Sequence, residues 1–183
     1  EGVDVCFEPG APAMYPSGFQ TVVSVPALAR RWEGHVRPHH FSGVATVVTK
    51  LFGIVHPHVA LFGQKDFQQA ALIRQLVDDL NLGVEIIVHP TVREADGLAM
   101  SSRNVYLTEK ERTIATILYR SLQAGAAAIR QGRCDGRAIE RLMAAVIGRE
   151  PALTIDYLAA CDALTLEPLT AIAGRTVLLG AIR

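Results

Sequence analysis

The residues best suited to binding an anion lie where an apolar run meets the start of a helix. Residues 59–62 are all apolar, which is typical of a strand buried on both faces in a parallel sheet. Gly63 allows a sharp turn, and Lys65 then places a cation beside the next helix. A helix start, a lysine and the carboxyl end of a parallel strand together favour phosphate.

The helix predicted after this turn runs from Asp66 to Asn81. Asp66 is expected to be its N-cap residue, with Gln69 three residues later as in a capping box. The inward apolar stripe consists of Leu72, Ile73, Leu76, Val77 and Leu80. The same pattern also fits an ordinary strand–glycine–helix turn in which Asp66 and Gln69 only cap the helix. The local sequence leaves both interpretations open.

A second polar stretch, residues 91–104, directly follows another predicted strand at 84–88. Ser101 and Ser102 offer hydroxyl and backbone donors, and Arg103 offers a planar fork of five N–H groups suited to phosphate oxygens. Each charge-assisted hydrogen bond contributes about 1.5–3 kcal/mol. The alternative is a polar linker between domains with weak surface ion pairs among Arg93, Glu94, Asp96 and Arg103.

The two stretches are expected to open onto one edge of one sheet, because both follow carboxyl ends of parallel strands. The composition of either stretch does not by itself predict the other stretch. The sequence therefore predicts that Lys65 and Arg103 converge on a common polyphosphate.

A basic segment precedes these stretches and has two interpretations. It is either a solvated loop or the wall of an anion pocket, and it contains Arg30, Arg31, His35, Arg37, His39 and His40. His35 and His39 are four residues apart, but Pro38 lies between them and no glutamate completes a zinc motif. No metal site is predicted from the histidines.

Composition excludes several classes of function. The 183 residues include 18 Lys and Arg against 18 Asp and Glu, so no overall field favours nucleic acid or a membrane surface. No apolar run approaches the ~20 residues that cross a bilayer, and no basic-then-apolar leader opens the chain. The three cysteines form no Cys-x-x-Cys pair and are expected to be reduced thiols that pack as small hydrophobes. We expect a soluble, cytoplasmic protein.

The order of elements predicts an α/β fold. Strands are expected at 3–7 and 21–25, and a helix at 43–55 that Pro57 ends. The helix at 43–55 links this first strand region to the strand at 59–62, and the helix after Asp66 leads to the strand at 84–88. This order of strand, helix, strand, helix and strand implies parallel crossovers and three parallel strands. Three such strands are part of a doubly wound sheet, whose other half would precede Glu1.

A small α+β unit is predicted after Pro90. Residues 108–111 form a capping box, and the helix that they begin is expected to continue to Gly132. Further elements are predicted from the apolar pattern: a helix over 138–148 and strands at 154–160 and 175–181. The predicted domains are residues 1–92 and residues 93–183.

Four segments together resemble the pantothenate synthetase (pantoate:β-alanine ligase) family of coenzyme A biosynthesis, over nearly the whole chain. They are EG at 33–34, RPHHFSGV at 37–44, FGQKDFQQ at 62–69 and, above all, PTVREADGLAMSSRN at 90–104. The resemblance implies a partial Rossmann-like, nucleotidyltransferase-type domain followed by a smaller C-terminal lid domain, in a homodimer. It also implies an ATP- and Mg²⁺-dependent reaction in which pantoate forms pantoyl adenylate, releasing pyrophosphate, and β-alanine then gives pantothenate and AMP.

The resemblance carries roles onto individual positions. Gln69 falls where the family holds pantoate, and Lys65 and Arg103 fall at ATP-binding positions. A catalytic role for these two cations is expected on physical grounds, because they would offset the repulsion between the pantoate carboxylate and the phosphates. The ATP-binding positions are Gly63, Gln64, Lys65, Asp66, Val92, Met100, Ser101, Ser102 and Arg103. Gln64 stands where the family is expected to have glutamate. Arg37 and His40 belong to the pattern without an assigned role.

The family's His-x-Gly-His motif does not occur in these 183 residues. We therefore expect the chain alone to bind ATP poorly and not to turn over. Two alternatives remain open: a non-catalytic fragment for dimerisation or closure, and a nucleotidyltransferase that uses a different carboxylate acceptor.

Overall fold

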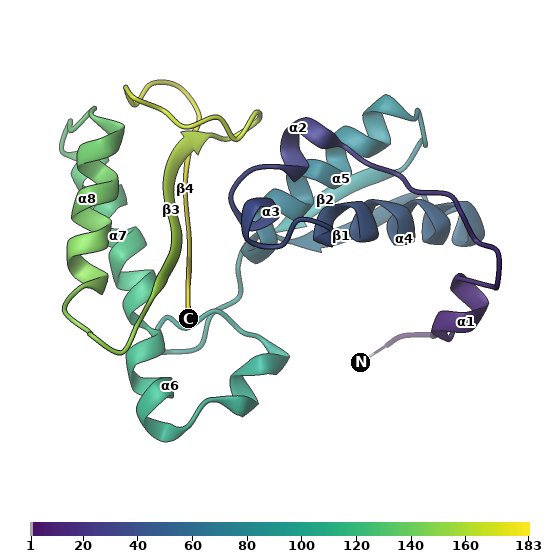
Figure 1. Ribbon diagram of the computed structural model, residues 1–183, viewed down its shortest axis with the longest axis horizontal. Coiled ribbons are helices and arrows are strands. Elements are labelled where there is room, and N and C mark those ends of the chain that lie inside the picture. The colour runs from purple at the N-terminus through teal and green to yellow at the C-terminus, as the bar shows by residue number, and fades with distance from the viewer. Residues whose placement is uncertain (1) are drawn as a thin grey trace.

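The computed structural model describes residues 2–183, which form two halves side by side (Figure 1). The first half holds a parallel sheet with helices, and the second holds an antiparallel hairpin with helices. The chain passes from one to the other through the linker after residue 89. This arrangement is mixed α/β, as predicted.

The first half is built around a two-stranded parallel sheet. β1 (Val59–Gly63) pairs in parallel with β2 (Glu85–His89). The crossover between them consists of the 3-10 turn η1 (Gln64–Asp66) and helix α5 (Phe67–Asp79). The predicted strand, turn, helix and strand are therefore confirmed. Both strands end at the same edge of the sheet, where the polar stretches begin.

Helix α4 (His40–Val55) packs beside α5 and confirms the helix predicted over 43–55. One hydrophobic cluster joins the two helices, and its buried members include Phe41, Ala45, Phe52, Leu72, Ile73 and Leu76. Three single-turn helices precede α4: α1 (Ala11–Met14), α2 (Pro26–Ala29) and α3 (Glu33–Val36). Within residues 2–183 no helix is both long and apolar enough to cross a membrane.

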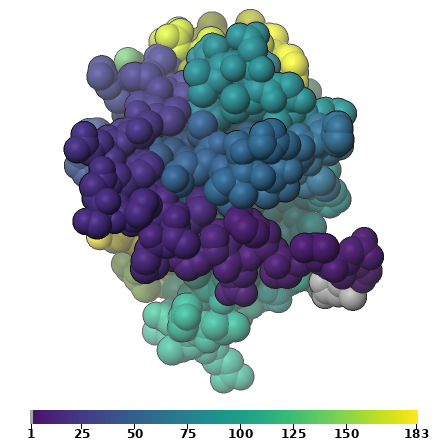
Figure 2. Space-filling view, turned by 90° about the vertical axis from the view of Figure 1, so that its right-hand side faces the viewer, coloured from purple at the N-terminus to yellow at the C-terminus, as the bar shows by residue number. Residues whose placement is uncertain are grey.

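The strand predicted at residues 3–7 is wrong. These residues are in no strand, and the side chains of Val3 and Val5 are 74% and 82% exposed. Figure 2 shows the first described residues, in purple, extending beyond the rest of the molecule. Alternation of apolar residues makes a strand only where a neighbouring strand satisfies the backbone. No described neighbour does so here.

The strand predicted at residues 21–25 is also wrong. The backbone N–H of Val23 donates to the Thr46 hydroxyl on α4, at 3.0 Å, instead of to a strand. The expected three parallel strands are therefore two among residues 2–183. The expected burial of β1 on both faces fails as well: Val59 is 40% and Leu61 69% exposed.

The second half stacks helices on a hairpin. α6 (Glu109–Ala115) and α7 (Ile117–Arg130) lead to α8 (Gly136–Ile147). β3 (Ile155–Asp162) and β4 (Thr176–Ile182) then pair in antiparallel fashion, and α7 and α8 pack against them. The predicted helix at 138–148 and both predicted strands are confirmed.

The start of α6 also follows its prediction, but its end does not. The Thr108 hydroxyl accepts from the backbone N–H of Glu111, and the Glu111 carboxylate accepts from the N–H of Thr108, which completes the capping box. The helix then breaks at Thr116 instead of continuing to Gly132. The Thr116 hydroxyl donates to the carbonyl of Thr113, a side-chain bond of the kind that bends helices.

The two halves touch through the connection between β3 and β4. The Trp32 indole N–H donates to the carbonyl of Leu166 at 3.0 Å, and Arg31 pairs with Glu167 at 3.0 Å. Leu166 is fully buried in the same hydrophobic cluster as Leu72. This cluster crosses the predicted boundary at residues 92 and 93, and the division into domains stays a prediction.

The cysteines behave in two ways. All three are free, but only Cys161 is buried, so the expected packing as a small hydrophobe is confirmed there and wrong for Cys6 and Cys134. Burial raises the pKa of the Cys161 thiol from 9.0 to about 12. The thiol of β3 is therefore protonated at neutral pH.

This burial predicts a loss of stability in alkali. The unfolded chain releases the Cys161 proton near pH 9, whereas the folded chain holds it until about pH 12. Ionisation thus favours the unfolded state as the pH rises through this window. Urea unfolding between pH 8 and 11 should show a falling free energy of unfolding, with a shallower fall in Cys161→Ala. Cys134→Ala, at an exposed thiol, is the matched control, and an equal slope in all three proteins would contradict the expectation.

Candidate functional site

A cavity of about 850 Å³ lies between the two halves. Its walls come from the α3–α4 segment, from the turn after β1, from the linker after β2, and from α7 and the β3–β4 hairpin. A smaller cavity of about 360 Å³ adjoins it, since Lys65, Asp66, Pro90 and Thr91 line both. The polar edge of the parallel sheet therefore opens into these two cavities.

The turn after β1 presents Lys65 to both cavities. Its ammonium lies 3.7 Å from the Asp66 carboxylate, and its side chain is 39% exposed, so this pair holds it weakly. The capping box predicted for Asp66 and Gln69 is wrong, because Asp66 makes no side-chain cap bond to α5. Asp66 is the last residue of the 3-10 turn η1, its backbone has φ −94° and ψ 61°, and its carboxylate pairs with Lys65 instead. The first backbone N–H groups of α5 are left without this cap.

The loop after β2 presents Ser101 and Arg103. Ser101 precedes the 3-10 turn η2 (Ser102–Tyr106), and its hydroxyl accepts from the backbone N–H of Arg103 at 3.2 Å. Among residues 2–183 the Arg103 guanidinium makes no ion pair. Its donors are therefore available to an anion.

The structure brings Lys65 and Arg103 to the walls of the same cavity, as the sequence predicts. Gln64 and Gln69 also line this cavity. The smaller cavity is lined by the remaining predicted residues except Ser102, namely Gly63, Val92, Met100 and Ser101. Ser102 is exposed and lines neither cavity.

The structure adds polar residues to the wall that the sequence left without a role. Arg37 pairs with Glu33 at 3.3 Å, one helical turn away, and both line the larger cavity with His40. Burial and the Arg37 guanidinium lower the pKa of His40, so its imidazole is neutral at pH 7. Burial raises the pKa of Tyr157 to about 12, which keeps its phenol protonated on the opposite wall.

Gln68 fixes this wall, and the sequence analysis missed it. Its side chain is buried and donates to the carbonyls of Leu28 and Arg31, at 2.7 and 2.8 Å. Its amide oxygen accepts from the backbone N–H of Glu33 at 3.2 Å. Gln68 therefore ties the start of α5 to the α2–α3 segment, and it lines the cavity together with Gln69. Only the position of Gln68 inside the 62–69 motif could have pointed to it.

The cavity wall carries charges of both signs, with cations in slight excess. The cations are Lys65, Arg37, Arg93 and Arg103, and the carboxylates are Asp66, Glu33 and Asp156. Among residues 2–183 no group of three or more His, Cys, Asp or Glu residues is placed to hold a metal ion. Such a surface suits a phosphate-bearing ligand with separate room for a smaller molecule.

This chain is similar in sequence to curated pantothenate synthetases. Pantothenate synthetase of Roseiflexus castenholzii is 52% identical over all 183 residues, which cover 66% of that protein. The Rhizobium etli enzyme is 49% identical over 96% of this chain and 59% of its own length. This chain thus spans about two thirds of the length of the curated relatives that it matches.

Solved structures agree. Pantoate-beta-alanine ligase (pantothenate synthetase) from Thermus thermophilus superposes with a TM-score of 0.92 at 45% identity, over 98% of this chain and 66% of that one. Pantoate-beta-alanine ligase from Francisella tularensis, complexed with beta-gamma ATP and beta-alanine, has a TM-score of 0.62 at 33% identity, over 80% of this chain and 52% of its own. The family model described as pantoate-beta-alanine ligase matches residues 1–183. The chain therefore belongs to the pantoate-beta-alanine ligase family.

Proposed function

We propose that these residues form the ATP- and pantoate-binding part of an enzyme that condenses pantoate with β-alanine. The observation that carries the proposal is that Lys65, Arg103 and Gln69 line one cavity between the two halves. The crystallised F. tularensis relative was complexed with beta-gamma ATP and beta-alanine, which supports ATP and β-alanine as ligands. Pantoate, the adenylate intermediate and the individual residue roles are part of the proposal.

In the first step the pantoate carboxylate attacks the α-phosphorus of ATP. An oxygen–phosphorus bond forms, the bond to the β-phosphate oxygen breaks, and pyrophosphate leaves. Two anions must approach each other, so the Lys65 ammonium and the Arg103 guanidinium would offset their charge and stabilise the transition state. The uncapped N–H groups at the start of α5 would add donors to phosphate oxygens.

In the second step the amine of β-alanine attacks the activated carbonyl, and AMP leaves as pantothenate forms. Gln69 would orient pantoate by its amide group. Alignment of this kind supplies as much as ~7–11 kcal/mol of a barrier. The cavity of about 850 Å³ has room for more than one small molecule.

Mg²⁺ would bind with the nucleotide, where it withdraws charge from the phosphates. It is usually held by one or two carboxylates together with phosphate oxygens and water, and not by a full protein cage. Asp66, in the wall of both cavities, fits that requirement. The same residues give no reason to expect nucleic acid as a partner. A cytoplasmic location and a homodimer are further parts of the proposal, and sedimentation of the purified protein tests the dimer.

Pyrophosphate release tests the function. The isolated chain is expected to release none, because its 183 residues lack the family's His-x-Gly-His motif. A chimaera in which the R. castenholzii relative supplies the part of its length that this chain does not match should release pyrophosphate with ATP and pantoate, and form pantothenate with β-alanine. A folded chimaera that is active with another carboxylate but not with pantoate would overturn the substrate assignment. An isolated chain as fast as the chimaera would overturn the need for the missing motif.

A further inference from the structure

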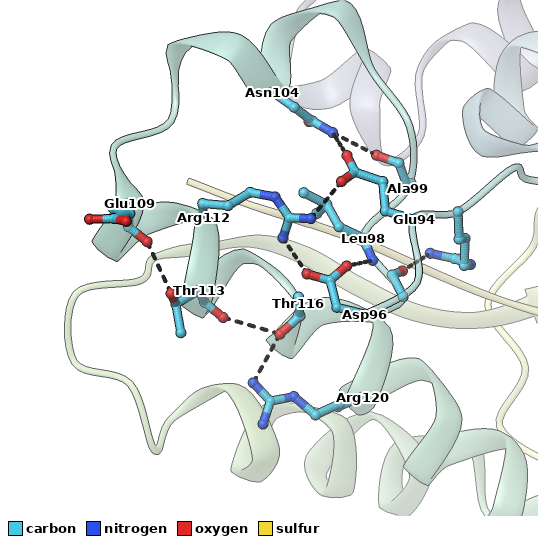
Figure 3. Close-up of polar contacts among 12 residues, drawn as sticks. Glu94, Asp96, Leu98, Ala99, Asn104, Glu109, Arg112, Thr113, Thr116 and Arg120 are labelled. Atoms are coloured by element: carbon cyan, nitrogen blue, oxygen red, sulfur yellow. Dashed lines mark hydrogen bonds and ion pairs between the residues drawn. The ribbon is translucent and has the colours of Figure 1, made fainter.

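Arg112, on α6, lies against the loop that carries Glu94, Asp96 and Asn104 (Figure 3). Ser101 and Arg103 belong to the same loop. Its guanidinium donates to the carboxylate of Glu94 at 2.7 Å and also to that of Asp96. One planar group therefore holds two acidic residues of a single loop. Such fork-shaped pairing restricts orientation as well as distance.

Glu94 passes this restraint to the residue that follows Arg103. Its second carboxylate oxygen accepts from the side-chain amide of Asn104 at 3.2 Å, and the same amide donates to the carbonyl of Ala99 at 3.1 Å (Figure 3). Arg112, Glu94 and Asn104 thus form a continuous chain of hydrogen bonds. It ends one residue from the Arg103 guanidinium that lines the cavity.

The tip of the loop is held from the other side by α7. The Arg93 guanidinium lies over the Tyr119 ring, 3.8 Å from its centroid, and donates to the carbonyl of Gly97 at 3.0 Å. Gly97 has φ +95°, and a β-carbon there would collide with the Tyr119 ring. The backbone N–H of Glu94 donates to the carbonyl of Leu98, and that of Gly97 donates to the carbonyl of Glu94, which closes the loop into a tight hairpin.

The same bonds neutralise negative charge near the proposed phosphate site. The hydrogen bond from Arg112 lowers the pKa of Asp96, so this carboxylate is ionised at neutral pH. Without a cation beside them, Glu94 and Asp96 would repel an anion bound by the same loop. Arg112 therefore both fixes the loop and offsets its charge.

We propose that Arg112 is a positioning residue, which acts through Glu94 and Asn104 to hold Ser101 and Arg103 in the walls of the two adjoining cavities. The inference rests on the proposed function, since it assumes that this loop binds the phosphates of ATP. The side chains of Arg112, Glu94 and Asp96 are 28%, 40% and 46% exposed. Partly exposed ion pairs contribute little to global stability. The effect of removing Arg112 is therefore local to the loop.

The test compares Arg112→Met and Arg112→Lys with the unmodified chain, and with Arg141→Met as the matched control. Arg141 is a surface arginine of α8 with its own carboxylate partner, Asp135, at 3.9 Å. Amide hydrogen exchange of residues 101–104 reports the order of the loop. NMR titration with ATP, which detects millimolar affinity, reports binding, and thermal unfolding reports stability.

Arg112→Met should speed exchange at residues 101–104 and weaken ATP binding, each about tenfold, with a melting temperature close to that of Arg141→Met. Arg112→Lys should restore only part of the protection from exchange and part of the ATP affinity, because an ammonium does not reproduce the planar, forked pairing of a guanidinium. Unchanged exchange in Arg112→Met, or faster exchange with unchanged ATP affinity, would overturn the positioning role. If the unmodified chain shows no ATP-dependent shifts, binding by this chain is contradicted, and faster exchange would still support the restraint on the loop.

Discussion

Replacing Lys65 by methionine in the active chimaera is expected to lower the rate of pyrophosphate release about 10²- to 10³-fold, the usual effect of removing one group that stabilises transition-state charge. Methionine is similar in length to lysine and carries no charge. The only carboxylate that pairs with Lys65 within residues 2–183 is Asp66, at 3.7 Å. The ammonium is therefore free to meet phosphate oxygens as negative charge develops on them.

Lys110→Met is the matched control for this prediction. Lys110 is an exposed residue of α6 and lines neither cavity. Initial rates of pyrophosphate release at saturating ATP and pantoate should be unchanged in this variant. Equal losses in both variants would show that lysine replacement acts on folding, and no loss in Lys65→Met would remove Lys65 from the proposed chemistry.

The convergence of Lys65 and Arg103 could be predicted because it follows from topology. β1 and β2 are parallel, so the segments that leave their carboxyl ends share an edge whatever lies between them. The helices α4, α5 and α8 could also be predicted from the sequence, since each buries a regular apolar face. These predictions depended either on a local sequence pattern or on the order of the strands and helices along the chain.

A capping-box sequence forms the cap only where the backbone of its first residue adopts the extended conformation. Thr108 and Glu111 form the predicted capping box because Thr108 has the extended backbone that such a cap requires. Asp66 does not cap α5, because it is the last residue of a 3-10 turn and its backbone lies outside the extended region. Both pairs have the right residues at the right spacing. The sequence did not distinguish them.

Contacts between residues far apart in the chain could not be predicted from the sequence. Gln68 bonds to Leu28 and Arg31, which lie 40 and 37 residues away. Trp32 bonds to Leu166 across 134 residues. Nothing in the local sequence pattern of Gln68 or Trp32 identifies its partner, so the part of the cavity wall that Gln68 holds in place could not be predicted. The failed strands at 3–7 and 21–25 have the same cause, because a strand exists only with its partner.

Gly34→Ala is expected to lower the free energy of unfolding by about 3 kcal/mol, at the upper end of the cost of overfilling a packed site. Gly34 is buried in α3, and a β-carbon there would collide with the backbone carbonyl of Ala29 and lie 3.2 Å from the Phe41 ring. A backbone carbonyl cannot rotate away as a side chain can. The α2–α3 segment must therefore move, which also displaces Glu33 from the cavity wall.

Gly53→Ala is the matched control, with the opposite expected sign. Gly53 is exposed within α4, and a β-carbon there would meet no atom within 4 Å. Alanine in a helix interior should stabilise the fold by about 0.5–1 kcal/mol. Urea unfolding measures both variants, and a Gly34→Ala protein as stable as the unmodified chain would show that the segment has room to yield. Because helix propensity favours alanine at both positions, a loss at residue 34 beside a gain at residue 53 can come only from the contact with Ala29 and Phe41.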